Sequence, residues 1–121
     1  MIREMGYERY MELVKSDLKM SGACPVRKTL ETLSGKWCLP VVYELCKKPS
    51  YRFGELKAAL DPITSTVLTS ALRDLEELGI VSRTQFNEIP PHVEYALTEM
   101  GEALFPVFYE MGIWGEEHLC R

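Results

Sequence analysis

One segment of the chain carries small polar side chains and one arginine, spaced so that they would lie on a single face of a helix. Its members are Ser65, Thr66, Thr69, Ser70 and Arg73. Residues three and four positions apart are neighbours on a helix, so these groups would lie together on one exposed side. Short hydroxyl groups and one guanidinium suit a surface that lies close against a polar partner. The pattern therefore predicts a binding surface.

Cys24 is a second candidate for chemistry, because it precedes Pro25 at the predicted start of a helix. Arg27 and Lys28 follow in the next turn. A helix N-terminus and nearby cations favour the thiolate form of a cysteine, and the thiolate is the form that reacts with oxidants. Two interpretations stay open from these residues: a redox-sensing thiol, or a half-buried small residue that only caps the helix.

The other cysteines and the histidines indicate neither a metal site nor a catalytic site. Cys38 and Cys46 fall on one predicted helix and are interpreted as inert core thiols, while Cys120 lies near the end of the chain. The short Cys-x-x-Cys spacing of zinc sites does not occur. Neither a glycine-rich phosphate loop nor a Gly-x-Ser-x-Gly elbow is found. We therefore predict no metal, no cofactor and no enzymatic activity.

Length, composition and charge restrict the class of protein. A chain of 121 residues with 46% hydrophobic residues is long enough for one domain and too short for two. Neither a run of about twenty apolar residues nor an apolar signal segment is found, so we expect a cytoplasmic protein without a membrane partner. The net charge of -4 disfavours nucleic acid, but residues 94–121 hold six acidic residues and one basic residue. Another face is therefore free to meet DNA.

Hydrophobic periodicity and end signals predict five helices before residue 80. The predicted ranges are Tyr7–Met20, Pro25–Leu33, Lys36–Lys47, Arg52–Leu60 and a fifth helix with Thr64 as N-cap that runs to Leu78. Gly79 provides a left-handed C-cap for the fifth helix, which lets Ile80 fold back onto Leu75. These end signals make the fifth helix the most clearly bounded element.

Two strands and one more helix are predicted in the last third of the chain. The strands run over Ile80–Phe86 and His92–Thr98, and residues 87–91 form the tip of the hairpin between them. Thr98 caps the final helix. A helix, a short helix, a tight turn, a polar-faced helix and a hairpin follow one another in the order of a winged helix-turn-helix. The predicted fold class is therefore α+β, mainly α, with a winged helix-turn-helix at its centre.

Two predicted amphipathic helices carry more apolar surface than one small domain covers, which indicates a homodimer. We divide the single domain 1–121 into an N-terminal dimerisation helix at 1–22, a winged-helix core at 24–98 and a C-terminal dimerisation helix at 99–121. The predicted interface residues are Tyr10, Leu13, Leu104, Phe108, Met111 and Trp114.

Four segments of the chain resemble one family of regulators. They read CPVRKTLETLSGKW, YRFGELKAAL, LRDLEELGIVSR and IPPHVEYALTEMGEALFPVFYEMGIWG, and together they span about Cys24 to Gly115. In these segments the chain is similar to the bacterial and archaeal HxlR-type regulators, relatives of the MarR group. The resemblance implies a dimeric transcription factor that often responds to oxidants or electrophiles through a cysteine, here Cys24.

The resemblance also implies where DNA would bind. The helix from Thr64 to Leu78 would be the recognition helix in the major groove, with Lys36 and Arg52 on phosphates and the hairpin at the neighbouring minor groove. The predicted contacts are Lys36, Arg52, Thr64, Ser65, Thr66, Thr69, Ser70, Arg73, Arg83 and His92. Members of the family commonly carry arginine where this chain has His92. The expected partners are a pseudo-palindromic operator in double-stranded DNA, a second copy of the chain, and a small hydrophobic effector.

Two other functions stay open alongside DNA binding. One is a winged-helix module that binds proteins and never binds DNA, which the acidic balance permits. The other is a thiol-based redox sensor that does not read DNA directly. An alternative interpretation of Ser65, Thr66, Thr69 and Ser70 is an ordinary solvated helix face, and the predicted wing favours DNA contact over it.

Overall fold

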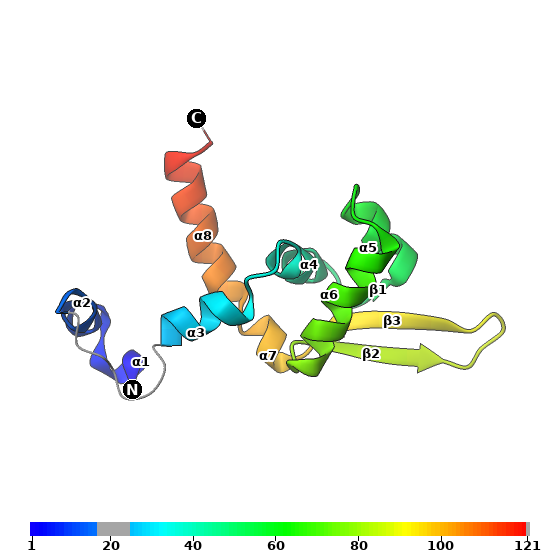
Figure 1. Ribbon diagram of the computed structural model, residues 1–121, viewed down its shortest axis with the longest axis horizontal. Coiled ribbons are helices and arrows are strands. Elements are labelled where there is room, and N and C mark those ends of the chain that lie inside the picture. Colours follow the sequence, from blue (N-terminus) through cyan, green and yellow to red (C-terminus); the bar gives the residue numbers. More distant parts are fainter. Residues whose placement is uncertain (17–24, 121) are drawn as a thin grey trace. The chain divides into compact units, whose positions relative to one another are not determined.

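Two separate units make up the part of the chain that the computed structural model describes, residues 1–16 and 25–120 (Figure 1). The first unit is Met1–Ser34 and the second is Gly35–Arg121. The division falls at the Ser34-Gly35 break that the sequence predicts between its second and third helices.

The described residues of the first unit form three helices: α1 (Ile2–Met5), α2 (Tyr7–Lys15) and α3 (Pro25–Thr32). The predictions of a helix from Tyr7 and of another from Pro25 are confirmed, whereas α1 was not predicted. Gly6 separates α1 from α2 with a φ of 86°, a conformation that favours glycine. No residue of these three helices is buried.

The core of the second unit is formed mainly by helices α4 (Cys38–Leu45), α5 (Phe53–Ala59) and α6 (Ser65–Glu77). In α6 the residues four and seven positions after Leu68 are Leu72 and Leu75, so all three lie on one side, where each is at most 2% exposed. Val41 and Leu56 contribute side chains from α4 and α5 that are fully buried. This packing fixes which side of α6 faces outward.

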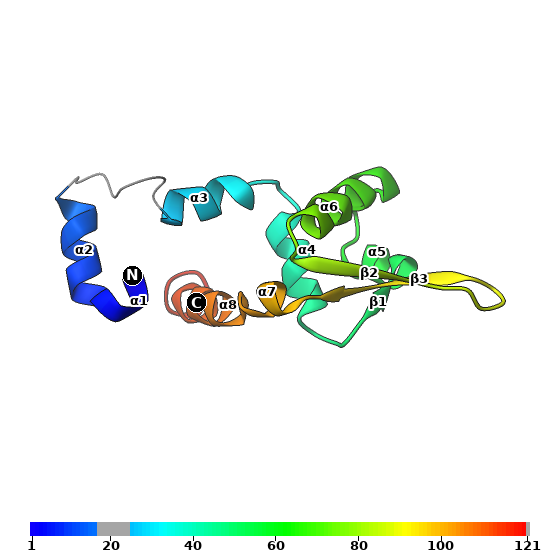
Figure 2. The ribbon, with the colours of Figure 1, turned by 90° about the horizontal axis from the view of Figure 1, so that it is seen from below.

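Three antiparallel strands form a sheet beside these helices: β1 (Tyr51–Arg52), β2 (Val81–Phe86) and β3 (His92–Leu97). β3 lies in the centre, with Tyr51 of β1 opposite Tyr95 and with Val81 of β2 opposite Leu97. Figure 2 shows α6 on one side of the sheet, while the β2–β3 hairpin extends beyond the helices as a wing. The predicted hairpin is therefore confirmed.

Strand β1 corrects the prediction that Arg52 begins a helix. Arg52 has an extended backbone, with a φ of -79° and a ψ of 157°, and it is the N-cap of α5. A strand of two residues is too short for its periodicity to be read from the sequence. The consequence is that Arg52 lies at the junction of the sheet and α5.

Both predicted ends of α6 are confirmed. The Thr64 hydroxyl accepts a hydrogen bond from the Val67 backbone N–H at 3.2 Å, which satisfies a free donor at the start of the helix. At the other end Gly79 has a φ of 82°, and the Ile80 N–H donates to the Leu75 carbonyl at 2.9 Å. These bonds define the start and the end of the helix.

The single helix predicted after Thr98 is wrong, because two helices occupy this segment: α7 (Glu99–Glu102) and α8 (Phe105–His118). Pro106 has no N–H to donate to the carbonyl four residues earlier, and it is favoured only in a first turn. The chain therefore begins a new helix, in which Pro106 lies within the first turn.

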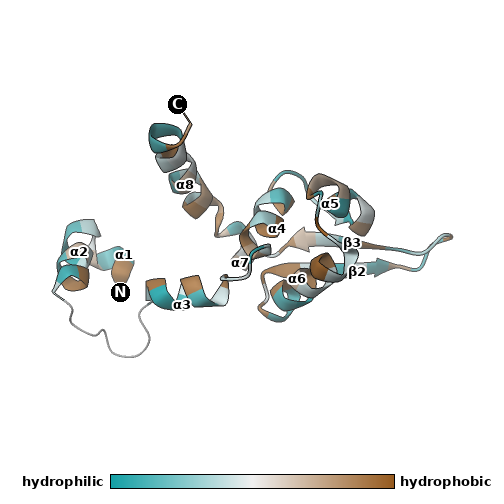
Figure 3. Ribbon diagram, turned by 45° about the horizontal axis from the view of Figure 1, so that its top comes forward, coloured by the Kyte–Doolittle hydropathy of each residue, from teal (hydrophilic) through white to brown (hydrophobic). Residues whose placement is uncertain are grey.

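Helix α8 projects away from the sheet and carries apolar residues near its start (Figure 3). None of its residues is buried, and Val107, Tyr109, Met111 and Trp114 are between 49% and 69% exposed. Despite this apolar character, no helix in the described part of the chain is long and apolar enough to span a bilayer.

Candidate nucleic-acid interface

The outward side of α6 carries the polar run that the sequence predicts as a binding surface. Ser65, Thr66, Thr69, Ser70 and Arg73 are all exposed. Their side chains form no hydrogen bond or ion pair with any other described residue, so their donors and acceptors are free for a partner. Thr64 differs from them, because its hydroxyl caps the helix.

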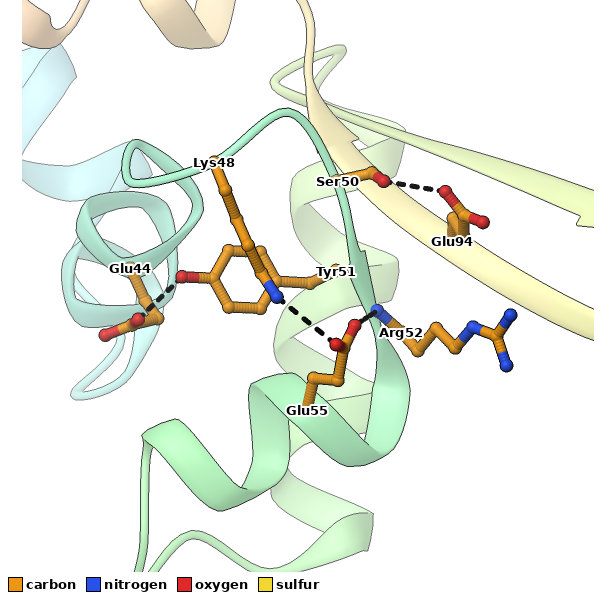
Figure 4. Close-up of polar contacts among 7 residues, drawn as sticks. All are labelled: Glu44, Lys48, Ser50, Tyr51, Arg52, Glu55 and Glu94. Atoms are coloured by element: carbon orange, nitrogen blue, oxygen red, sulfur yellow. Dashed lines mark hydrogen bonds and ion pairs between the residues drawn. The ribbon is translucent and has the colours of Figure 1, made fainter.

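Arg52 lies in β1 and is the N-cap of α5, the helix that precedes α6. A hydrogen bond fixes its backbone. Its N–H donates to Glu55 Oε1 at 2.7 Å, while Glu55 Oε2 lies 3.2 Å from Lys48 Nζ (Figure 4). The hydrogen bond from the Arg52 backbone, with Lys48 next in importance, lowers the pKa of the Glu55 carboxyl. The Arg52 guanidinium extends away from Glu55, so Glu55 fixes the backbone and leaves the charged group free.

Tyr51 anchors the same junction to α4. Its hydroxyl donates to Glu44 Oε2 at 2.7 Å, and the Lys48 ammonium lies 4.3 Å from the centre of its ring. Burial and the hydrogen bond to Glu44 raise the pKa of Tyr51 to about 12. Burial alone would raise the pKa of Glu44, but the hydrogen bonds from Tyr51 and Lys47 lower it overall. Glu44 is therefore charged and Tyr51 neutral at pH 7.

Of the two DNA contacts predicted on the wing, Arg83 is exposed and His92 is largely buried. Arg83 is exposed and lies opposite Tyr95, whereas Arg52 lies opposite Glu94, so the two arginines project from opposite faces of the sheet. The His92 side chain is only 13% exposed and stacks on Phe86, with ring centres 4.7 Å apart. His92 Nε2 lies 2.9 Å from Glu94, and its Nδ1 lies 4.0 Å from Glu88. Its ring is thus engaged within the wing.

Lys36 precedes α4 in an exposed turn at the start of the second unit. Its ammonium lies 5.7 Å from the centre of the Trp37 ring, a cation–π distance. The predicted role of Lys36 on a phosphate stays a prediction.

The cysteines of the described residues differ in their exposure to solvent. Cys24 lies outside the described residues. Cys38 is buried, and the Cys46 thiol donates to the Val42 carbonyl at 3.3 Å. Burial raises the pKa of Cys46, which disfavours its thiolate and agrees with an inert core thiol. Cys120 is exposed. Among the described residues, 1–16 and 25–120, no group of three or more cysteine, histidine or acidic side chains could hold a metal ion.

The predicted dimer residues lie in both units. Tyr10 and Leu13 are half-buried on α2, and Leu104 is half-buried at the start of α8. The Phe108 ring packs in a T-shaped arrangement with the Tyr43 ring of α4, with centres 5.4 Å apart, so part of its surface is used within the chain. Met111 and Trp114, in contrast, are 50% and 58% exposed.

Sequence analysis missed the polar groups that support Arg52. Glu44, Ser50, Tyr51, Glu55 and Glu94 form hydrogen bonds or ion pairs around the junction of β1 and α5 (Figure 4). Only Glu55 had a local signal, because a glutamate three residues after an N-cap commonly bonds the N-cap backbone. The others come together through strand pairing and helix packing.

The fold and this surface define a class of protein. Helices α5 and α6 are joined by a tight turn, the outward face of α6 is polar, and a β-hairpin wing lies beside them. This combination is a winged helix-turn-helix, whose second helix is the reader of the major groove.

Comparison with known proteins identifies the family. The HxlR-like helix-turn-helix family matches residues 32–121, so the chain belongs to this family of winged helix-turn-helix transcriptional regulators. The uncharacterized HTH-type transcriptional regulator YdeP of Bacillus subtilis is 41% identical over 98 residues, which are 81% of this chain and 76% of YdeP.

Solved structures agree with this assignment. A MarR family transcriptional regulator from Porphyromonas gingivalis W83 is 37% identical, with a TM-score of 0.76 over 84% of this chain and 100% of that one. The redox regulator HypR in its oxidized form is 41% identical, with a TM-score of 0.70 over 78% of this chain and 97% of HypR. The recognition of an HxlR-type winged helix-turn-helix from the sequence is confirmed.

Proposed function

We propose that this protein is a transcriptional regulator that binds a specific DNA operator by inserting α6 into the major groove. The observation that carries the proposal is the outward face of α6, where four hydroxyl groups and the Arg73 guanidinium are exposed and have no partner among the described residues. Short side chains of this kind let a helix approach base edges closely. The protein binds and releases DNA and catalyses no reaction.

We further assign different tasks to the arginines. Arg73 projects from α6 and reads a base, since guanidinium pairs with guanine are the commonest specific contact in the major groove. Arg52 and Lys36 neutralise backbone phosphates, which orient the protein on any sequence. Arg83 on the wing contributes to the adjacent groove.

The active species in this proposal is a homodimer on a pseudo-palindromic operator. Its support is the apolar surface of α8, whose Met111 and Trp114 are half-exposed or more in one chain. A two-fold dimer would bury this surface and present two copies of α6 about 34 Å apart, one turn of DNA. Its place of action is the cytoplasm, where the DNA of a bacterial or archaeal cell lies.

Selection of bound duplexes from a random pool tests the proposal. The full chain should enrich one inverted repeat with half-sites about one helical turn apart. The Ser65→Ala, Ser70→Ala double variant should enrich a weaker or altered repeat, and Glu110→Ala, which changes an exposed residue of α8, should enrich the original. Enrichment of no sequence by the folded chain would contradict the proposal and favour a protein-binding module.

We also propose that Cys24 makes this regulator responsive to oxidants. The proposal rests on the cations after Cys24 in the sequence and on the 41% identity with HypR, which is a redox regulator. A small hydrophobic effector stays an alternative to an oxidant. Diamide should change operator affinity in the wild type and leave Cys24→Ser unchanged, while Cys120→Ser should respond as the wild type does. An equal response in Cys24→Ser would refute the assignment.

A further inference from the structure

Arg52 and Glu94 lie directly opposite each other, yet they form no ion pair. They are partners in the antiparallel pairing of β1 with β3. Side chains opposite each other on such strands share a face and begin only about 5 Å apart, and opposite charges in these positions attract. In the described part of the chain, however, no hydrogen bond or ion pair joins the Arg52 guanidinium to Glu94. Figure 4 shows both side chains at this junction and marks no contact between the guanidinium and the carboxylate.

Both oxygens of the Glu94 carboxylate are held by other groups. The Ser50 hydroxyl donates to Oε1 at 2.6 Å, and His92 Nε2 lies 2.9 Å from Oε2. A carboxylate at pH 7 only accepts hydrogen bonds, so His92 Nε2 carries the hydrogen in this contact. The bond from Ser50, followed by that from His92, lowers the pKa of Glu94 and keeps it charged, and the nearby charge of Arg52 adds the smallest contribution without forming an ion pair.

The surroundings of His92 hold its ring in place for this contact. Phe86 stacks on one side with an angle of 12° between the rings, and Glu88 Oε2 lies 4.0 Å from the second ring nitrogen. The stacking on Phe86 and the hydrogen bond to Glu94 together favour one orientation of the ring. Ser50 is placed just as firmly, because it directly precedes β1.

We propose that Ser50 and His92 are positioning residues that hold the Glu94 carboxylate away from Arg52 and so keep the Arg52 guanidinium free for a DNA phosphate. This inference rests on the proposed function, in which Arg52 neutralises a phosphate. Without Ser50 or His92, the Glu94 carboxylate turns to Arg52 and competes with the phosphate for it. An ion pair between Glu94 and Arg52 at this spacing would have to be broken before Arg52 binds a phosphate, which would weaken DNA binding roughly two- to fivefold.

Binding of fluorescent duplexes to the full chain tests the inference. A mixture of random sequences at low salt is the probe, because phosphate contacts do not depend on sequence. Ser50→Ala should weaken binding roughly two- to fivefold and lower the dependence of affinity on salt. The same substitution should have no effect when Glu94→Gln or Arg52→Ala is already present. Ser82→Ala is the matched control, since Ser82 donates to the Ala96 carbonyl and should leave affinity unchanged.

Substitution of His92 gives a second, independent arm. His92→Ala should weaken binding, and Glu94→Gln should abolish this loss. A direct contact between His92 and DNA predicts instead that the loss persists in the Glu94→Gln background. His92→Gln retains a donor and should restore most of the affinity.

The outcomes separate this inference from the function on which it rests. If Arg52→Ala weakens binding but Ser50→Ala and His92→Ala do not, the positioning role is wrong and the phosphate contact stands. If Arg52→Ala leaves affinity unchanged, both are wrong. A loss in Ser50→Ala that is equally large in the wild-type and Glu94→Gln backgrounds would indicate a structural effect and would overturn the positioning role. Circular dichroism and thermal unfolding verify that each variant is folded.

Discussion

The part of the second unit from Cys38 to Leu97, called the core below, buries its apolar side chains, whereas helix α8, Phe105–His118, exposes them. In the core, Leu56, Leu68 and Leu75 are completely buried by other residues of the same chain. In α8 no residue is buried, and Trp114 is 58% exposed. The core therefore obtains its hydrophobic stabilisation within one chain, whereas in the homodimer that we propose α8 would obtain it from the second copy.

The polar side chains of the core fall into two groups, one exposed and without partners and one hydrogen-bonded within the chain. The hydroxyl groups and the guanidinium on the outward face of α6 have no partner in the described residues, while Tyr51, Glu44 and Glu55 are hydrogen-bonded around the junction of β1 and α5. The difference shows which surface each region offers. The core presents a polar surface suited to DNA, and α8 presents an apolar surface suited to a second copy.

The largest effect is expected when the buried side of α6 is truncated. Leu68→Ala removes a fully buried side chain and should lower the free energy of unfolding by about 2–5 kcal/mol. The loss relative to wild type should be the same at every protein concentration, because the contacts lie within one chain. Urea denaturation followed by circular dichroism measures it.

Leu78→Ala is the control for this substitution. Leu78 directly follows α6 and is 38% exposed, so its truncation should cost about 1 kcal/mol or less. Similar losses for the two variants would mean that the core is not the self-sufficient region described above.

A smaller effect that depends on protein concentration is expected in α8. Trp114→Ala should weaken dimerisation by about 2–4 kcal/mol, because exposed aromatic residues are frequent hot spots once an interface forms over them. Sedimentation equilibrium would show the dimer dissociating at higher protein concentrations than in the wild type. Glu110→Ala on the same helix should dimerise normally. A wild type that is monomeric at all concentrations would remove the contrast between the two regions.

The parts of the fold that were predictable from sequence are those with local signals. Thr64 and Gly79 bound α6 because an N-cap and a left-handed C-cap each depend on a few adjacent residues. The alternation from Val93 to Leu97 likewise predicted β3. The break before α8 also has a local signal, since Pro106 cannot continue a helix in its interior.

The support of Arg52 had no comparable signal. Ser50 and Glu94 are 44 residues apart and meet only because β1 pairs with β3. The sequence indicated which residues project from α6, because helical periodicity determines that. The direction of the Glu94 side chain depends instead on Ser50, which directly precedes β1, and on His92 in β3, so neither this contact nor the enclosure of His92 could be predicted.

Among the exposed groups of the core, Arg73 should have the largest effect on DNA binding. Arg73→Ala should reduce affinity for the selected operator by about 1–3 kcal/mol and relax sequence preference at one position. Arg52→Ala should weaken all sequences alike and lower the slope of log affinity against log salt by about 0.9. Fluorescence anisotropy with operator and scrambled duplexes distinguishes the two patterns.

Arg9→Ala is the matched control, because the Arg9 guanidinium lies in the first unit and pairs with Glu12 at 3.2 Å. It should change neither affinity nor salt slope. Equal losses on operator and scrambled DNA in Arg73→Ala would contradict the division between base reading and phosphate binding.

The smallest effect is expected from Tyr51→Phe, which removes the hydrogen bond to Glu44 and should cost about 1 kcal/mol of stability at pH 7. The pKa of Glu44 is lowered in the folded state, so its contribution is present above its usual value of 4.5 and is lost as the pH falls. The difference between variant and wild type should therefore shrink in acid.

The same substitution has a second signature in alkali. Tyr51 has a pKa of about 12 in the folded state against 10 normally, so the wild type loses stability as the pH rises above 10, where the unfolded chain ionises first. Tyr51→Phe should lose less over that range, whereas Tyr43→Phe, which alters a 53% exposed ring beside Glu44, should follow the wild type. Urea denaturation at pH 3.5, 7 and 11 measures all three. A difference that stayed constant across these values would mean that Tyr51 acts only through packing, because a hydrogen bond between two titrating groups makes stability depend on pH.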